Sequence, residues 1–327
     1  MCPYLNIPIQ CLLISKGAKM KIQKIIGFCC LNTIFFVFTH GQTQVPQKVQ
    51  DKIACIVTQD GKPTEQLTEL FNYFKIQHNG TLKDMALKAA EKWALQDNFN
   101  PREKLNISVT NDISPLISKL GLIDAIEFTS QKFYKYAVVV GGFVSTVKSR
   151  ISYLKKFWDQ GIRFEKIIFL TGQRALHIER DSVKELCTDS HKTIPSHLQI
   201  KKDWEFNNKA SYKTEYDMVK LVYDQLDLPQ EMRALPVVFV NATSYSFPYR
   251  SNCIKTWLET HPEPGDCLAV VNQPYVTALY VAFKNILPKD FKIIDVVGYA
   301  IDKQYHSAEI WLEGIASFLY EECLRQI

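Results

Sequence analysis

The chain has 327 residues, 46% hydrophobic and 22% charged, a composition typical of a globular protein that buries a sizeable core. This composition excludes fibrous, repetitive and low-complexity proteins. The net charge of +5 comes from 39 basic and 34 acidic side chains, which are spread along the chain rather than clustered with aromatic residues. We therefore expect no nucleic acid among its partners.

The first 45 residues differ in kind from the rest and predict a leader. Met20 is the expected start, followed by the basic residues Lys21 and Lys24, an apolar run over residues 25–38 and small and polar residues around Gly41. An apolar run shorter than the about 20 residues that span a membrane is typical of a secretory signal peptide. No Ala-x-Ala cleavage site follows, so two outcomes stay open. The protein is exported to the periplasm or the outside, or the uncleaved N-terminal segment anchors it to the membrane.

Five of the nine cysteines lie outside this leader, widely scattered and odd in number. Neither they nor the histidines have the spacing of metal ligands, and we predict no metal site. If the protein is exported, a disulfide bond between Cys187 and Cys253 is possible, but the sequence does not determine whether it forms.

Residues 46–132 predict a helical N-terminal subdomain. A β-like run is expected over residues 52–58, and a helix that Thr64 caps follows it to about residue 74. A second helix is expected over residues 82–96. A third, short one is expected to begin near Pro115, because proline is favoured in a first helical turn.

Residues 133–327 predict an α/β domain. Its expected strands are continuous apolar runs, which suit strands buried on both faces of a parallel sheet. They cover residues 136–140, 166–170, 236–241, 266–271 and 292–297. Helical segments alternate with them, at about residues 145–160, 214–225, 250–260, 274–287 and 306–325. The pattern predicts a doubly wound, mostly parallel Rossmann-like sheet of about five strands, with residues 175–211 as an insertion beside the site.

In such sheets, ligands bind beyond the carboxyl ends of the strands. The candidate contacts are therefore the residues that follow the predicted strands: Gly141 and Gly142; Thr171, Gly172 and Arg174; residues 241–244; and Asn272, Gln273 and Tyr275. A glycine pair before a helix suits an anion, although a tight turn explains it equally well. Adjacent amides suit a sugar or a base.

Two arginines and one carboxylate add charge to these turns. Arg150, on the first helix of the sheet domain, and Arg174 are candidate clamps for a phosphate or carboxylate, or else surface ion pairs. Thr214 and Asp217 have the spacing of a capping box. This cap does not need Glu215, which is left to accept ligand hydroxyls or to act as a general base.

Several familiar motifs are missing from the sequence. It has neither a Gly-x-Gly-x-x-Gly fingerprint nor a Walker loop, so no NAD or ATP site is implied. It has no Gly-x-Ser-x-Gly elbow either, which disfavours an ordinary α/β-hydrolase.

Taken in order, these pieces resemble the family of unknown function that includes the SanA, ElyC and YdcF proteins, among them the vancomycin high-temperature exclusion protein. The resemblance covers about residues 134–300 and rests on Gly141-Gly142, Arg150, Thr171-Gly172, Glu179, Thr214-Glu215 and Asn272-Gln273. The chain departs from the family at Gln173, Arg174 and Tyr216 and lacks the family's His, as a divergent member would. The resemblance implies a Rossmann-like fold, a role in cell-envelope metabolism, and a nucleotide or S-adenosylmethionine as ligand.

Three hypotheses follow from the sequence. The first is an exported or membrane-anchored protein that binds a nucleotide-like or sugar-phosphate anion, chiefly through Arg174, Glu215 and Asn272. The second is a non-catalytic envelope scaffold whose residues 52–132 bind a partner. The third is a hydrolase in which Glu179 or Glu215 acts as the base.

Overall fold

The computed structural model describes residues 47–94, 107–188, 198–206, 212–243, 249–300 and 308–326. All of them belong to one compact unit, residues 42–327. The predicted leader lies outside the described residues. Within the described ranges, no helix has the length and apolar character needed to cross a membrane.

The centre of the fold is a sheet of five parallel strands in the order β3-β2-β1-β4-β5. The strands are β1 (Phe133–Val140), β2 (Arg163–Gly172), β3 (Val237–Ala242), β4 (Cys267–Asn272) and β5 (Ile294–Tyr299). Each coincides with a predicted apolar run, and the predicted doubly wound α/β fold is confirmed.

Both faces of this sheet are covered, which explains why its strands read as continuous apolar runs. On β1, Tyr136 and Val138 belong to one hydrophobic core, whereas Ala137 and Val139 belong to the other. Successive side chains of a strand point to opposite faces, so a strand buried on both sides needs apolar residues at every position.

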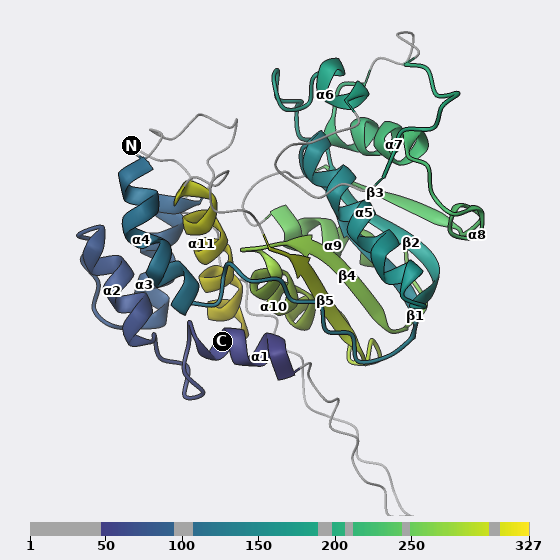
Figure 1. Cartoon of the computed structure of the whole chain (residues 1–327). Helices are drawn as coiled ribbons and strands as arrows, with labels where there is room; N and C mark the ends of the chain where they lie inside the picture. Colours follow the sequence, from purple (N-terminus) through teal and green to yellow (C-terminus); the bar gives the residue numbers. More distant parts are fainter. Residues whose placement is uncertain are drawn as a thin grey trace, which may run out of the picture. The chain divides into compact units, whose positions relative to one another are not determined.

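The helices of the α/β domain form two layers (Figure 1). Helices α5 (Val144–Asp159) and α7 (Glu215–Gln225) pack on one face, and α9 (Tyr249–Glu259) and α10 (Val276–Ile286) pack on the other. Two short helices, α6 (Val183–Cys187) and α8 (Gln230–Arg233), lie in the connections. Because the helices cover both faces of the sheet, the loops of this domain come together at the ends of the strands.

The helical N-terminal part packs against the last helix of the chain, α11 (Ala308–Arg325), as Figure 1 shows. It consists of α1 (Gln47–Ala54), α2 (Glu65–Tyr73), α3 (Leu82–Trp93) and α4 (Ile107–Lys119). Thr64 caps α2, as predicted, by accepting a hydrogen bond from the Leu67 N–H. Helix α11 contacts α3 and α4 on one side and α10 on the other, so it joins the helical part to the sheet.

Two predictions in this part are wrong. Residues 52–58 are not a β-like run, because the chain is helical to Ala54 and then turns, with one antiparallel bridge between Val57 and Pro63. Val49 and Ile53, one helical turn apart, are both buried, and this spacing favours a helix. Pro115 lies inside α4 rather than in a first turn. The buried neighbours Ile113, Leu116 and Ile117 offset the hydrogen bond that proline removes.

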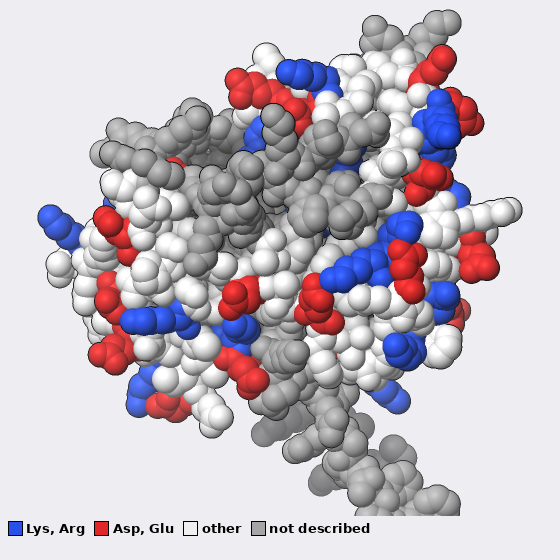
Figure 2. Space-filling model, viewed as in Figure 1, with Lys and Arg blue, Asp and Glu red and all other residues white. Residues whose placement is uncertain are grey.

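One face of the described surface carries both signs of charge in close mixture (Figure 2). On the face in Figure 2, basic and acidic side chains are interspersed. Pairs such as Lys155 with Asp159 and Lys156 with Glu127 bring opposite charges to 2.6 Å. Interspersed charges give little long-range steering, so any attraction for an anion must come from charges grouped locally.

Candidate functional site

The strand order reverses between β1 and β4. The chain runs outward from β1 through β2 to β3, and then returns to place β4 and β5 on the other side of β1. The loops after β1 and β4 therefore diverge, and the carboxyl ends of these two strands are where ligands of open α/β sheets bind. Gly141-Gly142 follow β1, Asn272 is the last residue of β4, and Gln273 follows it.

Arg150 and Asn272 meet at this reversal point. Arg150 lies on α5 and is 3% exposed. Its Nε donates to the Asn272 Oδ1 at 3.2 Å and its Nη2 to the same oxygen, while its Nη1 donates to the Val140 carbonyl at 2.8 Å and to that of Gly141. Burial lowers the pKa of Arg150 from its ordinary value. In the part of the chain that the structure describes, no carboxylate forms an ion pair with this guanidinium.

Arg174, in the turn after β2, has its charge balanced by a neighbour that we did not predict. Its Nη1 lies 2.8 Å from the Asp181 Oδ2, and its Nη2 donates to the Gly142 carbonyl at 3.0 Å. Asp181 also accepts from the backbone N–H groups of Val144, at the start of α5, and His177. Arg174 and Asp181 therefore tie the insertion after β2 to the turn after β1.

Glu215 is the first residue of α7 and is 2% exposed. Its Oε2 accepts from the Gly172 N–H at 3.3 Å, and its Oε1 lies 4.0 Å from the Arg174 Nε. This Oε1 accepts no hydrogen bond from any described residue. Burial raises the pKa of Glu215 to about 7, although the nearby Arg174 charge opposes the rise. A carboxyl with such a pKa is able to exchange a proton near neutral pH.

Gly141 is required by this arrangement. A Cβ atom at this position would lie 2.6 Å from the Glu215 Oε1 and 3.1 Å from the Leu170 carbonyl oxygen. Glycine is therefore needed to let the backbone after β1 approach the carboxylate. These contacts concern Gly141 alone, and both interpretations of the glycine pair, a tight turn and part of a site, agree with them.

Arg150, Arg174, Asp181, Glu215, Asn272 and Gly141 are hereafter called the strand-end cluster. Five of the predicted site residues contribute no group to this cluster, and Tyr275, which lies against Arg250, is one of them. The Thr171 hydroxyl donates to the Val240 carbonyl, and Thr214 forms the predicted capping box with Asp217. The Gln273 Nε2 donates to the Asp124 carbonyl at 2.7 Å. Glu179 is exposed on the insertion, and the structure does not bring it to Glu215.

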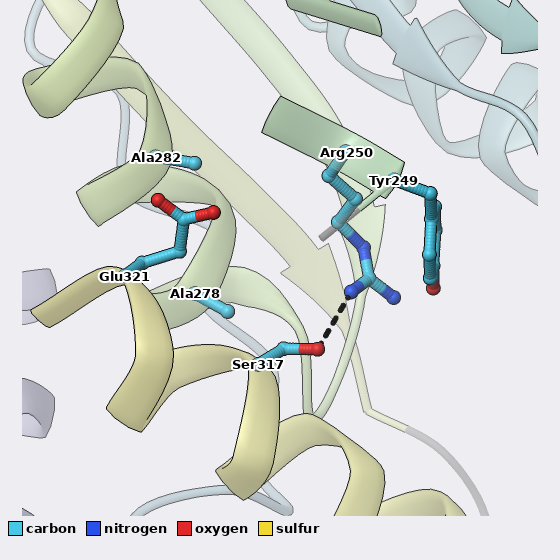
Figure 3. A pocket seen from close by; sticks show the side chains of 6 residues that line it. All are labelled: Tyr249, Arg250, Ala278, Ala282, Ser317 and Glu321. Carbon is cyan, nitrogen blue, oxygen red and sulfur yellow. Dashed lines mark hydrogen bonds between the residues drawn. The ribbon is translucent and has the colours of Figure 1, made fainter. Parts of the chain in front are cut away.

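Arg250, which sequence reasoning missed, lies beside the cluster near Tyr275. It is 6% exposed, and its guanidinium carbon lies 4.0 Å from the centre of the Tyr275 ring. Its Nη1 donates to the Ser317 Oγ at 3.1 Å, as Figure 3 shows, and lies 3.5 Å from the Glu313 Oε1. The charge of Arg250 contributes to the lowered pKa of Arg150. Its position in the first turn of α9, the helix after β3, was the available signal. Ser244, predicted in the loop between them, lies outside the described residues.

Figure 3 shows a small cavity between α9, α10 and α11, beside Arg250. Its volume is about 10 Å³, and its lining consists of Tyr249, Arg250, Ala278, Ala282, Ser317 and Glu321. This space is of the size of one water molecule. The cavity therefore does not hold a ligand of the kind that the strand-end cluster would bind.

No three His, Cys, Asp or Glu side chains among the described residues are grouped as metal ligands. Cys187 and Cys253 are free thiols.

The chain matches no protein-family model, no curated protein and no solved structure. The resemblance to the SanA, ElyC and YdcF family therefore stays a prediction, and function has to be argued from the site itself.

Proposed function

We propose that the protein binds an anionic small molecule at the carboxyl ends of β1, β2 and β4, with Arg150, Glu215 and Asn272 as the contacts. One observation carries this proposal. A buried guanidinium that forms no ion pair with any described carboxylate shares a cluster with Glu215, which influences it only through space and has a buried carboxyl oxygen without a hydrogen bond.

Arg150 supports an anion rather than a neutral ligand. Burying a charge is costly unless an opposite charge or strong hydrogen bonds compensate it. Carbonyl and amide oxygens satisfy part of the Arg150 fork, but they carry no net charge. A phosphate or carboxylate supplies both the charge and acceptors in the geometry that arginine prefers.

Glu215 supports a ligand with hydroxyl or acidic groups. Its free Oε1 accepts a hydrogen bond from a sugar hydroxyl when ionised and donates one to a phosphate oxygen when protonated. A pKa of about 7 makes both forms accessible. We therefore favour sugar phosphates and nucleotides, to which the family resemblance adds S-adenosylmethionine. A role in cell-envelope metabolism follows from that resemblance and from the predicted leader.

The proposal is tested by thermal shift with a panel of sugar phosphates, nucleotides and S-adenosylmethionine. We expect at least one compound to raise the Tm of the wild type and to do so much less in Arg150→Lys, which keeps the charge but loses the fork. Arg163→Lys is the matched control, because Arg163 lies at the opposite end of β2 and donates to the carbonyls of Trp158 and Ile162. A panel without any effect, or an equal shift in Arg150→Lys, would refute the proposed site.

Glu215 also favours a second candidate, a hydrolase in which this residue is the general base. A base with a pKa near 7 suits catalysis at neutral pH. We expect Glu215→Gln to lose about 100-fold or more of any hydrolysis of phosphate or glycosyl esters. Glu179→Gln should retain it, because Glu179 is exposed and apart from the cluster. Hydrolysis that persists in Glu215→Gln excludes this mechanism.

A further inference from the structure

The helical N-terminal part carries a second candidate binding site, at a distance in the sequence from the strand-end cluster. Helices α2 and α3, with the turn after α2, form a groove of about 350 Å³. Phe74, Ile76 and Trp93 supply the apolar part of its lining, and three lysines, Lys75, Lys88 and Lys92, supply the basic part. This volume lies in the range of small-molecule sites.

The apolar side of this groove, hereafter the α2–α3 groove, is held in place by aromatic contacts. The ring of Trp93 lies 4.8 Å from that of Phe71 and 5.7 Å from that of Phe74, both in edge-on arrangements. Trp93 itself is 4% exposed, and Phe71 is fully buried. Because these rings are packed, the apolar lining is formed before a ligand arrives.

Lys75 has a backbone conformation that glycine adopts at a lower free-energy cost than lysine. The Lys75 N–H donates to the Asn72 carbonyl and the Ile76 N–H to the Phe71 carbonyl, so α2 ends in a Schellman motif. The Lys75 φ is +54°, in the left-handed region, which disfavours residues that have a Cβ atom. A lysine therefore stands at the groove in a backbone conformation that is unfavourable for residues with a Cβ atom.

The charges around the α2–α3 groove are unbalanced. Its lining contains one carboxylate, Glu91, which forms an exposed ion pair with Lys92 at 3.0 Å. Lys75 and Lys88 form no ion pair with any residue that the structure describes. Glu91 also interacts electrostatically with Lys88, so three lysines share one carboxylate. The complement of this surface is a negatively charged group on an apolar body.

We propose that the α2–α3 groove binds a small organic anion with an aromatic or aliphatic body. The body lies against Phe74, Ile76 and Trp93, and the acid group faces Lys75 and Lys88. This site is independent of the strand-end cluster and of the function proposed for it.

The probe for this test is 2-naphthoate, with the neutral 2-naphthamide as its matched control. Saturable binding is measured by calorimetry and by the change in tryptophan fluorescence, since Trp93 lines the groove. We expect naphthoate to bind at least about tenfold more tightly than the amide, since a charged hydrogen bond is worth about that factor. Equal affinities, or no saturable binding by the wild type, would overturn the proposal.

Lys75→Gly is the decisive variant. It removes one amino group and relieves the left-handed backbone conformation, so its Tm should be equal to or higher than that of the wild type, while naphthoate affinity falls about tenfold. Lys88→Gln should weaken binding similarly. Lys83→Gln, which alters an exposed lysine of α3 outside the lining, should leave it unchanged. Undiminished affinity in Lys75→Gly and Lys88→Gln contradicts the assignment.

Discussion

Replacing Glu215 with glutamine is expected to abolish a loss of stability that we predict for the wild-type protein as the pH rises from about 4.5 to about 7. The folded protein holds the Glu215 proton more tightly than the unfolded chain does, because burial raises the pKa of this carboxyl. Between the two pKa values the native state binds more protons, so the free energy of unfolding falls with rising pH. The penalty is absent below pH 4.5 and complete above pH 7.

The size of this effect follows from the pKa values. A rise from 4.5 to about 7 corresponds to about 3 kcal/mol. Urea denaturation of the wild type and of Glu215→Gln at pH 4.5, 6 and 8 measures it, and the variant should gain most at pH 8. Glu179→Gln, which alters an exposed carboxylate, serves as control and should leave the pH dependence unchanged. Parallel curves for the wild type and Glu215→Gln would show that Glu215 is not held protonated by burial.

Arg150→Met is expected to lower the free energy of unfolding by about 3 kcal/mol. The substitution removes the donors that satisfy the carbonyl oxygens of Val140 and Gly141 and the Asn272 Oδ1. Buried acceptors left without hydrogen bonds cost about 1 to 3 kcal/mol each, and partial relaxation reduces the sum. The methionine conserves part of the buried volume, so the loss reports mainly on polar contacts.

Lys155→Met is the control for this measurement. Lys155 lies on the same helix but is partly exposed and pairs with Asp159 one turn away. Such surface pairs contribute about 0.5 kcal/mol or less, so the control should lose at most that amount. If the two variants were equally stable, the buried arginine would not be a principal contact between α5 and the turn after β4.

The positions of the strands could be predicted because a strand buried on both faces needs apolar residues at nearly every position, and this pattern is visible in the sequence. Residues 136–140 and 266–271 are apolar at almost every position, which few other structures require. Once the strands are placed, the geometry of a parallel sheet brings their carboxyl ends to one edge. For this reason Arg150, Glu215 and Asn272, which lie far apart in the chain, could be expected in one cluster.

Other features of the structure depend on contacts between residues far apart in the sequence, which local sequence patterns do not predict. Asp181 lies in an insertion without periodicity, and only the folded chain brings it 2.8 Å from Arg174. That contact also explains why Arg174, expected as a principal ligand contact, is already occupied by a carboxylate. Pro115 is tolerated inside α4 because its neighbours are buried, and local preference alone predicts a helix start there.

The hydrogen bonds between Arg150 and Asn272 have a consequence for any ligand of the strand-end cluster. The Asn272 side chain occupies part of the guanidinium that an incoming anion would use, and its own amide donates to the Gln273 carbonyl at 2.7 Å. A ligand of the proposed site would have to replace the Asn272 Oδ1 as the acceptor of these hydrogen bonds, so the proposed contact with Asn272 forms only after this exchange. Selectivity then favours strongly basic oxygens, since only these exchange with an amide oxygen at a gain. A weakly basic anion would leave the hydrogen bonds between Arg150 and Asn272 in place.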